Sequence, residues 1–161
     1  MDWSIACHAR WPIIGHERPE DAAMDINELV AIHMLGWAVL LGVVQLVLSV
    51  AFNVGGRGLT YGVGARDDPP KPLGKIASRA ERAYRNFIET FAFFAAAVFV
   101  TYALGKATAS SAFGAELYLW SRVLYAPLYI LGVPWLRTLA WTASIVAIVV
   151  VWSAAGLSVL N

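Results

Sequence analysis

Apolar residues dominate four stretches of this 161-residue chain, and polar or charged residues separate them. The stretches cover residues 29–52, 79–104, 113–131 and 135–160. At about 1.5 Å per residue, each helix would cross or nearly cross a hydrocarbon core of about 30 Å. The pattern therefore predicts an all-α integral membrane protein with four transmembrane helices.

Breaks between and before the stretches suggest how they are connected. Gly132 and Pro134 lie in a very short turn, which predicts an antiparallel hairpin of the last two helices, and Pro127 can be accommodated inside the third. Residues 1–25 form a polar tail that lacks the apolar core of a signal peptide, so residues 26–161 are the predicted membrane domain. The break in composition motivates the hypothesis that Met24 is the true start, which peptides from residues 1–23 in mass spectra would refute.

The composition agrees with a membrane protein and excludes several other classes. Hydrophobic residues make up 59% of the chain and charged residues 14%, and the net charge is +1. Nucleic-acid binding needs a basic surface, so no nucleic-acid partner is expected. The single Cys7 cannot form an intramolecular disulfide, and no clustered His or Cys motif predicts a metal site.

Basic residues gather on one side of the predicted membrane. The loop 53–78 contains Arg57, Arg66, Lys71 and Lys75, whereas Lys106 is alone in the next loop. By the positive-inside rule, the loop 53–78 faces the cytoplasm and both termini lie on the opposite side.

The second stretch begins with a polar face. At about 100° per residue, Arg79, Arg82, Asn86 and Glu89 fall within an arc of about 80°, and Arg85 lies on its flank. These residues either fix the topology by reaching lipid headgroups or bind a small anionic ligand.

The third stretch has a matching stripe of Tyr118, Arg122, Tyr125 and Tyr129. An unpaired guanidinium at the depth of Arg122 would cost at least about 2.5 kcal/mol, so it needs a partner, and Glu89 is the obvious internal candidate. Topology requires neither an amide nor phenols, whereas a peptide-like ligand would use both. A small transporter is a more distant alternative, because the polar residues cluster at one side rather than across the bilayer.

The run Arg82-Ala-Tyr-Arg85-Asn86-Phe-Ile-Glu89, followed by an aromatic-rich span, resembles the signature Arg-Ala-His-x-Asn-x-x-Glu-x-x-Pro-x-Phe of the MAPEG family, the membrane-associated proteins in eicosanoid and glutathione metabolism. The resemblance extends to Arg66-Asp-Asp-Pro, typical of bacterial members, to Arg122-x-x-Tyr125-x-x-x-Tyr129 and to Pro134-x-x-Arg137-Thr138. Two positions depart from the signature. Tyr84 replaces the usual His, and Ala92 replaces a Pro that would kink the helix.

The resemblance implies a left-handed four-helix bundle that forms a homotrimer in the bacterial inner membrane, with glutathione held between subunits near the cytoplasmic face. By matching positions, the implied glutathione-binding residues are Arg82, Arg85, Asn86, Glu89, Arg122, Tyr125 and Tyr129. Arg137 and Thr138 match the place where family enzymes stabilise the thiolate. A guanidinium beside the sulfur favours the nucleophilic thiolate.

The function implied is that of a glutathione-dependent transferase or peroxidase, similar to microsomal glutathione transferases, that acts on lipophilic electrophiles. The alternative is a lipid-binding or scaffold protein of the same family without enzymatic activity. The residues do not distinguish conjugation from peroxide reduction or isomerisation, or glutathione from another thiol.

Overall fold

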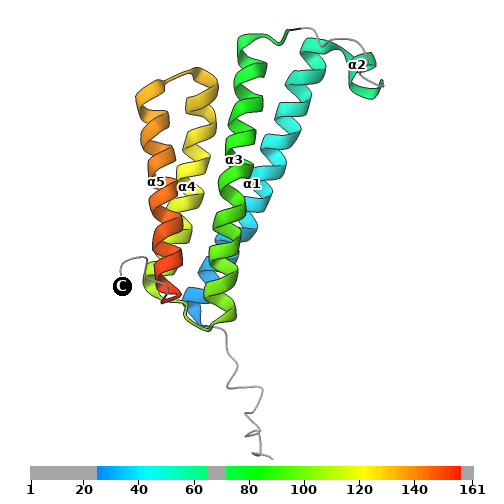
Figure 1. Ribbon diagram of the computed structural model, residues 1–161. Helices are drawn as coiled ribbons and strands as arrows, with labels where there is room; N and C mark the ends of the chain where they lie inside the picture. Colours follow the sequence, from blue (N-terminus) through cyan, green and yellow to red (C-terminus); the bar gives the residue numbers. More distant parts are fainter. Residues whose placement is uncertain (1–24, 65–71, 157–161) are drawn as a thin grey trace, which may run out of the picture.

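The computed structural model describes residues 25–64 and 72–156, which form helices joined by short connections. The long helices are α1 (Ile26–Arg57), α3 (Lys75–Ala103), α4 (Ala109–Leu131) and α5 (Pro134–Ala154), and α2 (Leu59–Val63) is short. The long helices lie side by side and alternate in direction, so residues 25 and 156 are at the same end of the bundle (Figure 1). The predicted all-α architecture of four long helices is confirmed.

The long helices begin before the apolar stretches that predicted them. α1, α3 and α4 start at residues 26, 75 and 109 rather than 29, 79 and 113, because their first turns are polar but still helical. The predicted tail before Asp25, the start at Met24, the loop residues Arg66 and Lys71, and residues 157–160 of the last stretch lie outside the described residues.

Three helices, α1, α3 and α5, are long and apolar enough to cross a membrane. α4 is less apolar because it carries Glu116 and Arg122, and it runs the length of the bundle beside the other three. Large apolar side chains such as Phe93, Phe99 and Trp120 are more than 60% exposed. Such a surface suits contact with lipid or with another subunit, and the chain is an integral membrane protein.

Local hydrogen bonds fix both ends of α4. At its start, the Thr108 hydroxyl accepts from the Ser111 N–H and the Ser111 hydroxyl accepts from the Thr108 N–H, which is a capping box. At its end, Gly132 adopts a φ of 82°, and its N–H donates to the Leu128 carbonyl at 3.0 Å. Pro134 then begins α5. The predicted antiparallel hairpin of these two helices is therefore confirmed.

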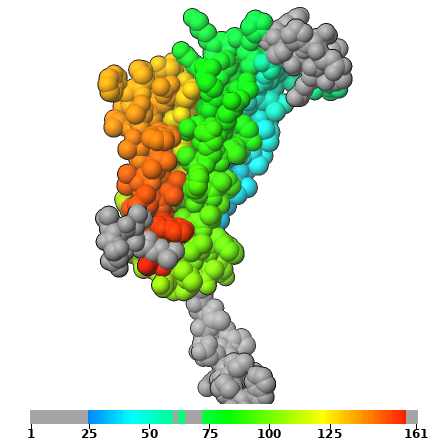
Figure 2. All heavy atoms as spheres, viewed as in Figure 1, coloured from blue at the N-terminus to red at the C-terminus, as the bar shows by residue number. Residues whose placement is uncertain are grey.

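Small residues let the helices pack closely. Ala38, Ala97, Ala115 and Ala147 are at most 1% exposed in the core. Phe94 of α3 stacks on Tyr118 of α4, with ring centroids 3.9 Å apart. Close packing through small side chains is typical of membrane helices. α3 has α5 on one side and α1 on the other in the face shown in Figure 2, so its polar residues can reach two different neighbours.

Candidate functional site

Arg122 is buried inside the bundle and bonds to α3. Its side chain is 1% exposed, and one guanidinium nitrogen donates to Asn86 Oδ1 at 2.9 Å. The other terminal nitrogen donates to the Thr90 hydroxyl, which lies 3.3 Å from the Tyr118 hydroxyl. The guanidinium carbon is also 5.2 Å from the centroid of the Tyr125 ring. Arg122 therefore links the polar faces of α3 and α4.

The predicted pairing of Arg122 with Glu89 is wrong. Asn86 and Thr90, one helical turn apart, present their oxygens to Arg122. Glu89 is exposed and lines a cavity on another side of α3. The sequence predicted which residues form the polar arc of α3. Which of them face α4 depends on how the helices pack.

A small cavity lies where α3, α4 and the start of α5 meet. Its volume is about 190 Å³, and its lining residues come from all three helices: Asn86, Tyr125, Tyr129, Arg137, Thr138 and Trp141. Five of these six were identified from the sequence. Trp141 was not, although it lies one turn after Arg137 on the same helix and so on the same side.

The cationic part of the small cavity is held by aromatic and backbone contacts. The Arg137 guanidinium lies 4.6 Å from the centroid of the Tyr129 ring, and the rings of Tyr125 and Tyr129 are 5.5 Å apart. The Thr138 hydroxyl donates to the Pro134 carbonyl at 3.0 Å. Arg137 and Thr138 lie in the first two turns of α5, near the helix end whose dipole favours a negative charge. The cavity therefore combines a cation, phenols and an amide.

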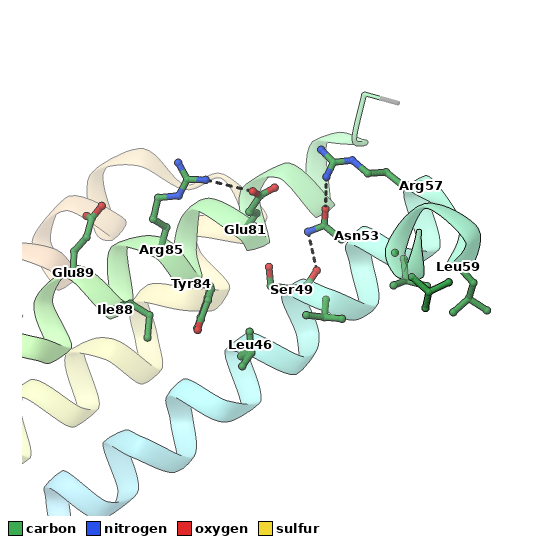
Figure 3. A pocket seen from close by; sticks show the side chains of 14 residues that line it. Leu46, Ser49, Asn53, Arg57, Leu59, Glu81, Tyr84, Arg85, Ile88 and Glu89 are labelled. Atoms are coloured by element: carbon green, nitrogen blue, oxygen red, sulfur yellow. Dashed lines mark hydrogen bonds and ion pairs between the residues drawn. The ribbon is translucent and has the colours of Figure 1, made fainter. Parts of the chain in front are cut away.

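A larger cavity of about 720 Å³ lies between α1, α2 and α3 (Figure 3). Its polar wall includes Arg85, which pairs with Glu81 at 3.4 Å, together with Glu89 and Tyr84. Ser49, Asn53 and Arg57 of α1 add to the polar lining, and apolar residues of the three helices, such as Leu46, Leu59 and Ile88, form the rest.

The predicted site residues are thus divided between two places. The small cavity is lined by Asn86, Tyr125, Tyr129, Arg137 and Thr138, whereas Arg85 and Glu89 line the large one. Arg122 is buried and lines neither. Arg82 lines neither, and its guanidinium donates to the Ser78 hydroxyl at 2.6 Å. Within the described residues, no group of three His, Cys, Asp or Glu side chains could hold a metal ion.

Comparison with known proteins identifies a family. The model of the MAPEG family matches residues 34–157, which is most of the chain and includes every residue of both cavities. Neither the curated proteins nor the solved structures gave a match.

Proposed function

Because this chain belongs to the MAPEG family, whose members are membrane proteins related to glutathione and eicosanoids, we propose that it is a glutathione-dependent transferase or peroxidase for lipophilic electrophiles. The observation that carries this proposal is the small cavity. It is lined by Arg137, by Tyr125 and Tyr129, and by the Asn86 amide, all of which match positions of the family's binding or catalytic residues.

The chemistry proposed for the small cavity is activation of a thiol. A free thiol has a pKa near 8.5, and a guanidinium beside the sulfur favours the thiolate at neutral pH. Arg137 would supply that charge, and the N-terminal dipole of α5 would add to it. In conjugation, the thiol proton leaves to water, the thiolate forms a bond to the electrophilic carbon, and the leaving group departs with its electron pair.

We propose that two subunits of a homotrimer share each glutathione. The small cavity of about 190 Å³ is below the roughly 300–1,000 Å³ of common ligand sites. Arg85 and Glu89 lie on another face of the bundle, where they could bind a ligand held against the small cavity of a neighbouring copy. Arg82 is exposed on the same helix, where it could join such a contact.

The first experiment is calorimetric titration of the detergent-purified protein with glutathione, together with kinetics on a model electrophile. Arg137→Ala should lower kcat about a hundredfold, because a charge that stabilises the reacting thiolate is lost, and should change glutathione affinity little. Lys75→Ala is the matched control, since Lys75 is a cation at the same end that lines neither cavity.

Three outcomes would count against the proposal. Equal losses of kcat and affinity in Arg137→Ala would argue against its role at the thiolate, and an equal effect of Lys75→Ala would show only a general charge effect. Absence of glutathione binding in a folded protein would argue against the site itself.

A second candidate function is lipid binding without catalysis. The large cavity favours it, because a lining that combines charged, polar and apolar residues suits an amphiphile better than a water-soluble tripeptide. Full thiol-conjugating activity of the triple variant Arg82→Ala, Asn86→Ala and Arg137→Ala would count against the proposed site. No thiol-conjugating activity of the unaltered, folded protein would favour the second candidate.

We also propose that the segment that joins α1 to α3 and the turn between α4 and α5 face the cytoplasm of a bacterial inner membrane. Lys75, Arg79, Arg82, Arg85 and Arg137 lie towards that end of the bundle, which supports this orientation. Alkaline phosphatase fused after Asn161 should be active and the same enzyme fused after Val133 inactive; the reverse would refute the orientation.

A further inference from the structure

A groove of about 590 Å³ runs along the outside of the bundle between α1 and α4, away from both cavities described above. Its walls are apolar, with Leu40 and Val44 from α1 and Leu119 and Val123 from α4. Two indoles also line it, and both are largely uncovered: Trp37 is 57% exposed and Trp120 63%.

Among the described residues, Glu116 is the one charged side chain that lines this groove. It is exposed, and within residues 25–64 and 72–156 it makes no hydrogen bond or ion pair. A carboxylate beside apolar walls at the surface of a membrane helix is costly unless a cation accompanies it. A positive charge beside Glu116 would therefore be favourable.

The position of Glu116 along the bundle suits a lipid headgroup. It lies seven residues after the start of α4, which is about 10 Å along the axis. The hydrocarbon core is about 30 Å thick and the whole bilayer about 40–45 Å, so Glu116 lies near the boundary between headgroups and acyl chains. From there the apolar walls continue towards the middle of the bundle, since Val44 and Val123 lie further from that end.

The described part of the chain does not offer this positive charge to Glu116. Most of its Lys and Arg residues lie towards the opposite end of the bundle, near the start of α3 and of α5. At the end near Glu116, the Lys106 ammonium donates to the Ala155 carbonyl. A second copy of these helices would bring the same distribution, so it would not supply a suitable charge.

We propose that this groove binds a membrane lipid with a primary-amine headgroup. The ammonium group pairs with the Glu116 carboxylate, and the exposed faces of Trp37 and Trp120 provide aromatic contacts for the cation and the glycerol region. An acyl chain lies along Leu40, Val44 and Val123. The proposal does not depend on glutathione chemistry, because the groove shares no residue with either cavity.

The test is native mass spectrometry of the full-length protein with equal amounts of phosphatidylethanolamine, phosphatidylcholine and phosphatidylglycerol. The ethanolamine lipid should be retained about fivefold over the other two, which corresponds to about 1 kcal/mol. Choline has no N–H to donate, and the glycerol lipid is anionic. Glu116→Gln should abolish the preference, whereas Glu28→Gln, at the same end but outside the groove, should keep it. Equal retention of the three lipids by the unaltered protein, or an unchanged preference in Glu116→Gln, would overturn the proposal.

A second measurement asks whether protein covers the groove instead. A nitroxide spin label is attached at Val123→Cys in a chain that also carries Cys7→Ser. Its collision rate with oxygen dissolved in the bilayer should be high, and it should fall by about half when the ethanolamine lipid is added. A label shielded from oxygen in every lipid would show that another subunit fills the groove, and the proposal would then be wrong.

Discussion

Arg122 is a buried cation whose hydrogen-bond partners are both neutral. Asn86 and Thr90 accept from its terminal nitrogens, and the rings of Tyr118 and Tyr125 lie 5.6 and 5.2 Å from its guanidinium carbon. Its Nε has no partner among the described residues. Without a carboxylate, the charge depends on every remaining contact, so removing one should be costly.

Asn86→Leu should lower the free energy of unfolding by about 2–3 kcal/mol, because the guanidinium loses an acceptor that it cannot replace with water. Adding Arg122→Met should recover part of that loss, since the unpaired charge is then removed as well. A double-mutant cycle would compare the free energies of unfolding, in mixed detergent micelles, of the unaltered protein, Asn86→Leu, Arg122→Met and the double variant. Strictly additive losses would show that the hydrogen bond between Asn86 and Arg122 contributes little.

At this scale, the residue types were predictable but the partners were not. The spacing of Tyr125, Tyr129, Arg137 and Thr138, with the family resemblance, pointed to residues that do line one cavity. The acceptor for Arg122 could not be chosen between Asn86 and Glu89, which lie about 60° apart around the helix. Packing decides such a difference, and it leaves Glu89 in the other cavity.

The contact between α4 and α5 depends on a glycine. A Cβ built on Gly114 would lie 2.8 Å from Val151 Cγ2 and 3.1 Å from the Ala147 carbonyl oxygen, so a side chain would force the helices apart. Gly36 of α1, by contrast, has nothing within 4 Å of the same position. The two glycines are both helical, and they differ in the space around them.

Gly114→Ala should therefore destabilise the protein by about 1–3 kcal/mol through overpacking. Gly36→Ala is the matched control and should stabilise it by up to about 1 kcal/mol, because alanine is the better helix former. Thermal unfolding of the two variants in detergent provides the comparison. If both substitutions changed the stability alike, the close packing at Gly114 would not be a determinant of the fold.

Arg79 joins the start of α3 to the end of α4. Its guanidinium donates to the Ile130 carbonyl at 3.1 Å, and a Cβ on Gly132 would lie 2.6 Å from the same group. Arg79→Ala should loosen the turn that precedes Arg137 and raise amide exchange at Gly132 and Val133 about tenfold. Arg82→Ala is the control, because Arg82 bonds within α3 to Ser78. Exchange rates that rise equally in the two variants would contradict this role of Arg79.

Helices and turns were more predictable than the contacts between them. Apolar length predicted the four long helices, and Gly132 with Pro134 predicted the turn between α4 and α5. The sequence did not predict that Arg79, 53 residues before Gly132, reaches this turn, because that contact depends on how α3 lies against the hairpin. Ala92, where the family signature has a proline, lies within the unbroken helix α3.

For the whole molecule, the division of the predicted binding residues is the most consequential feature. Arg85 and Glu89 line the large cavity, and Arg137 and Thr138 line the small one. If neighbouring subunits of a trimer join these two faces head to tail, each active site combines Arg85 and Glu89 of one chain with Arg137 and Thr138 of the next. Trimers that contain two different defective variants would then include some intact active sites.

Arg85→Ala/Glu89→Ala and Arg137→Ala should each be nearly inactive at low glutathione concentration, the first through weak binding and the second through slow chemistry. In trimers assembled at random from equal amounts of the two, about one site in four would combine an intact Arg137 half with an intact Arg85 half from its neighbour. Coexpression with two affinity tags should therefore restore about a quarter of the wild-type rate.

The control is a mixture of the same two proteins that are purified separately and combined in detergent without exchange of subunits, which should stay inactive. Coexpressed trimers that remain as inactive as this control would show that the two halves do not combine across subunits. If Arg85 and Glu89 then proved dispensable as well, the small cavity alone would have to hold the thiol, and its volume of about 190 Å³ would favour a smaller thiol than glutathione.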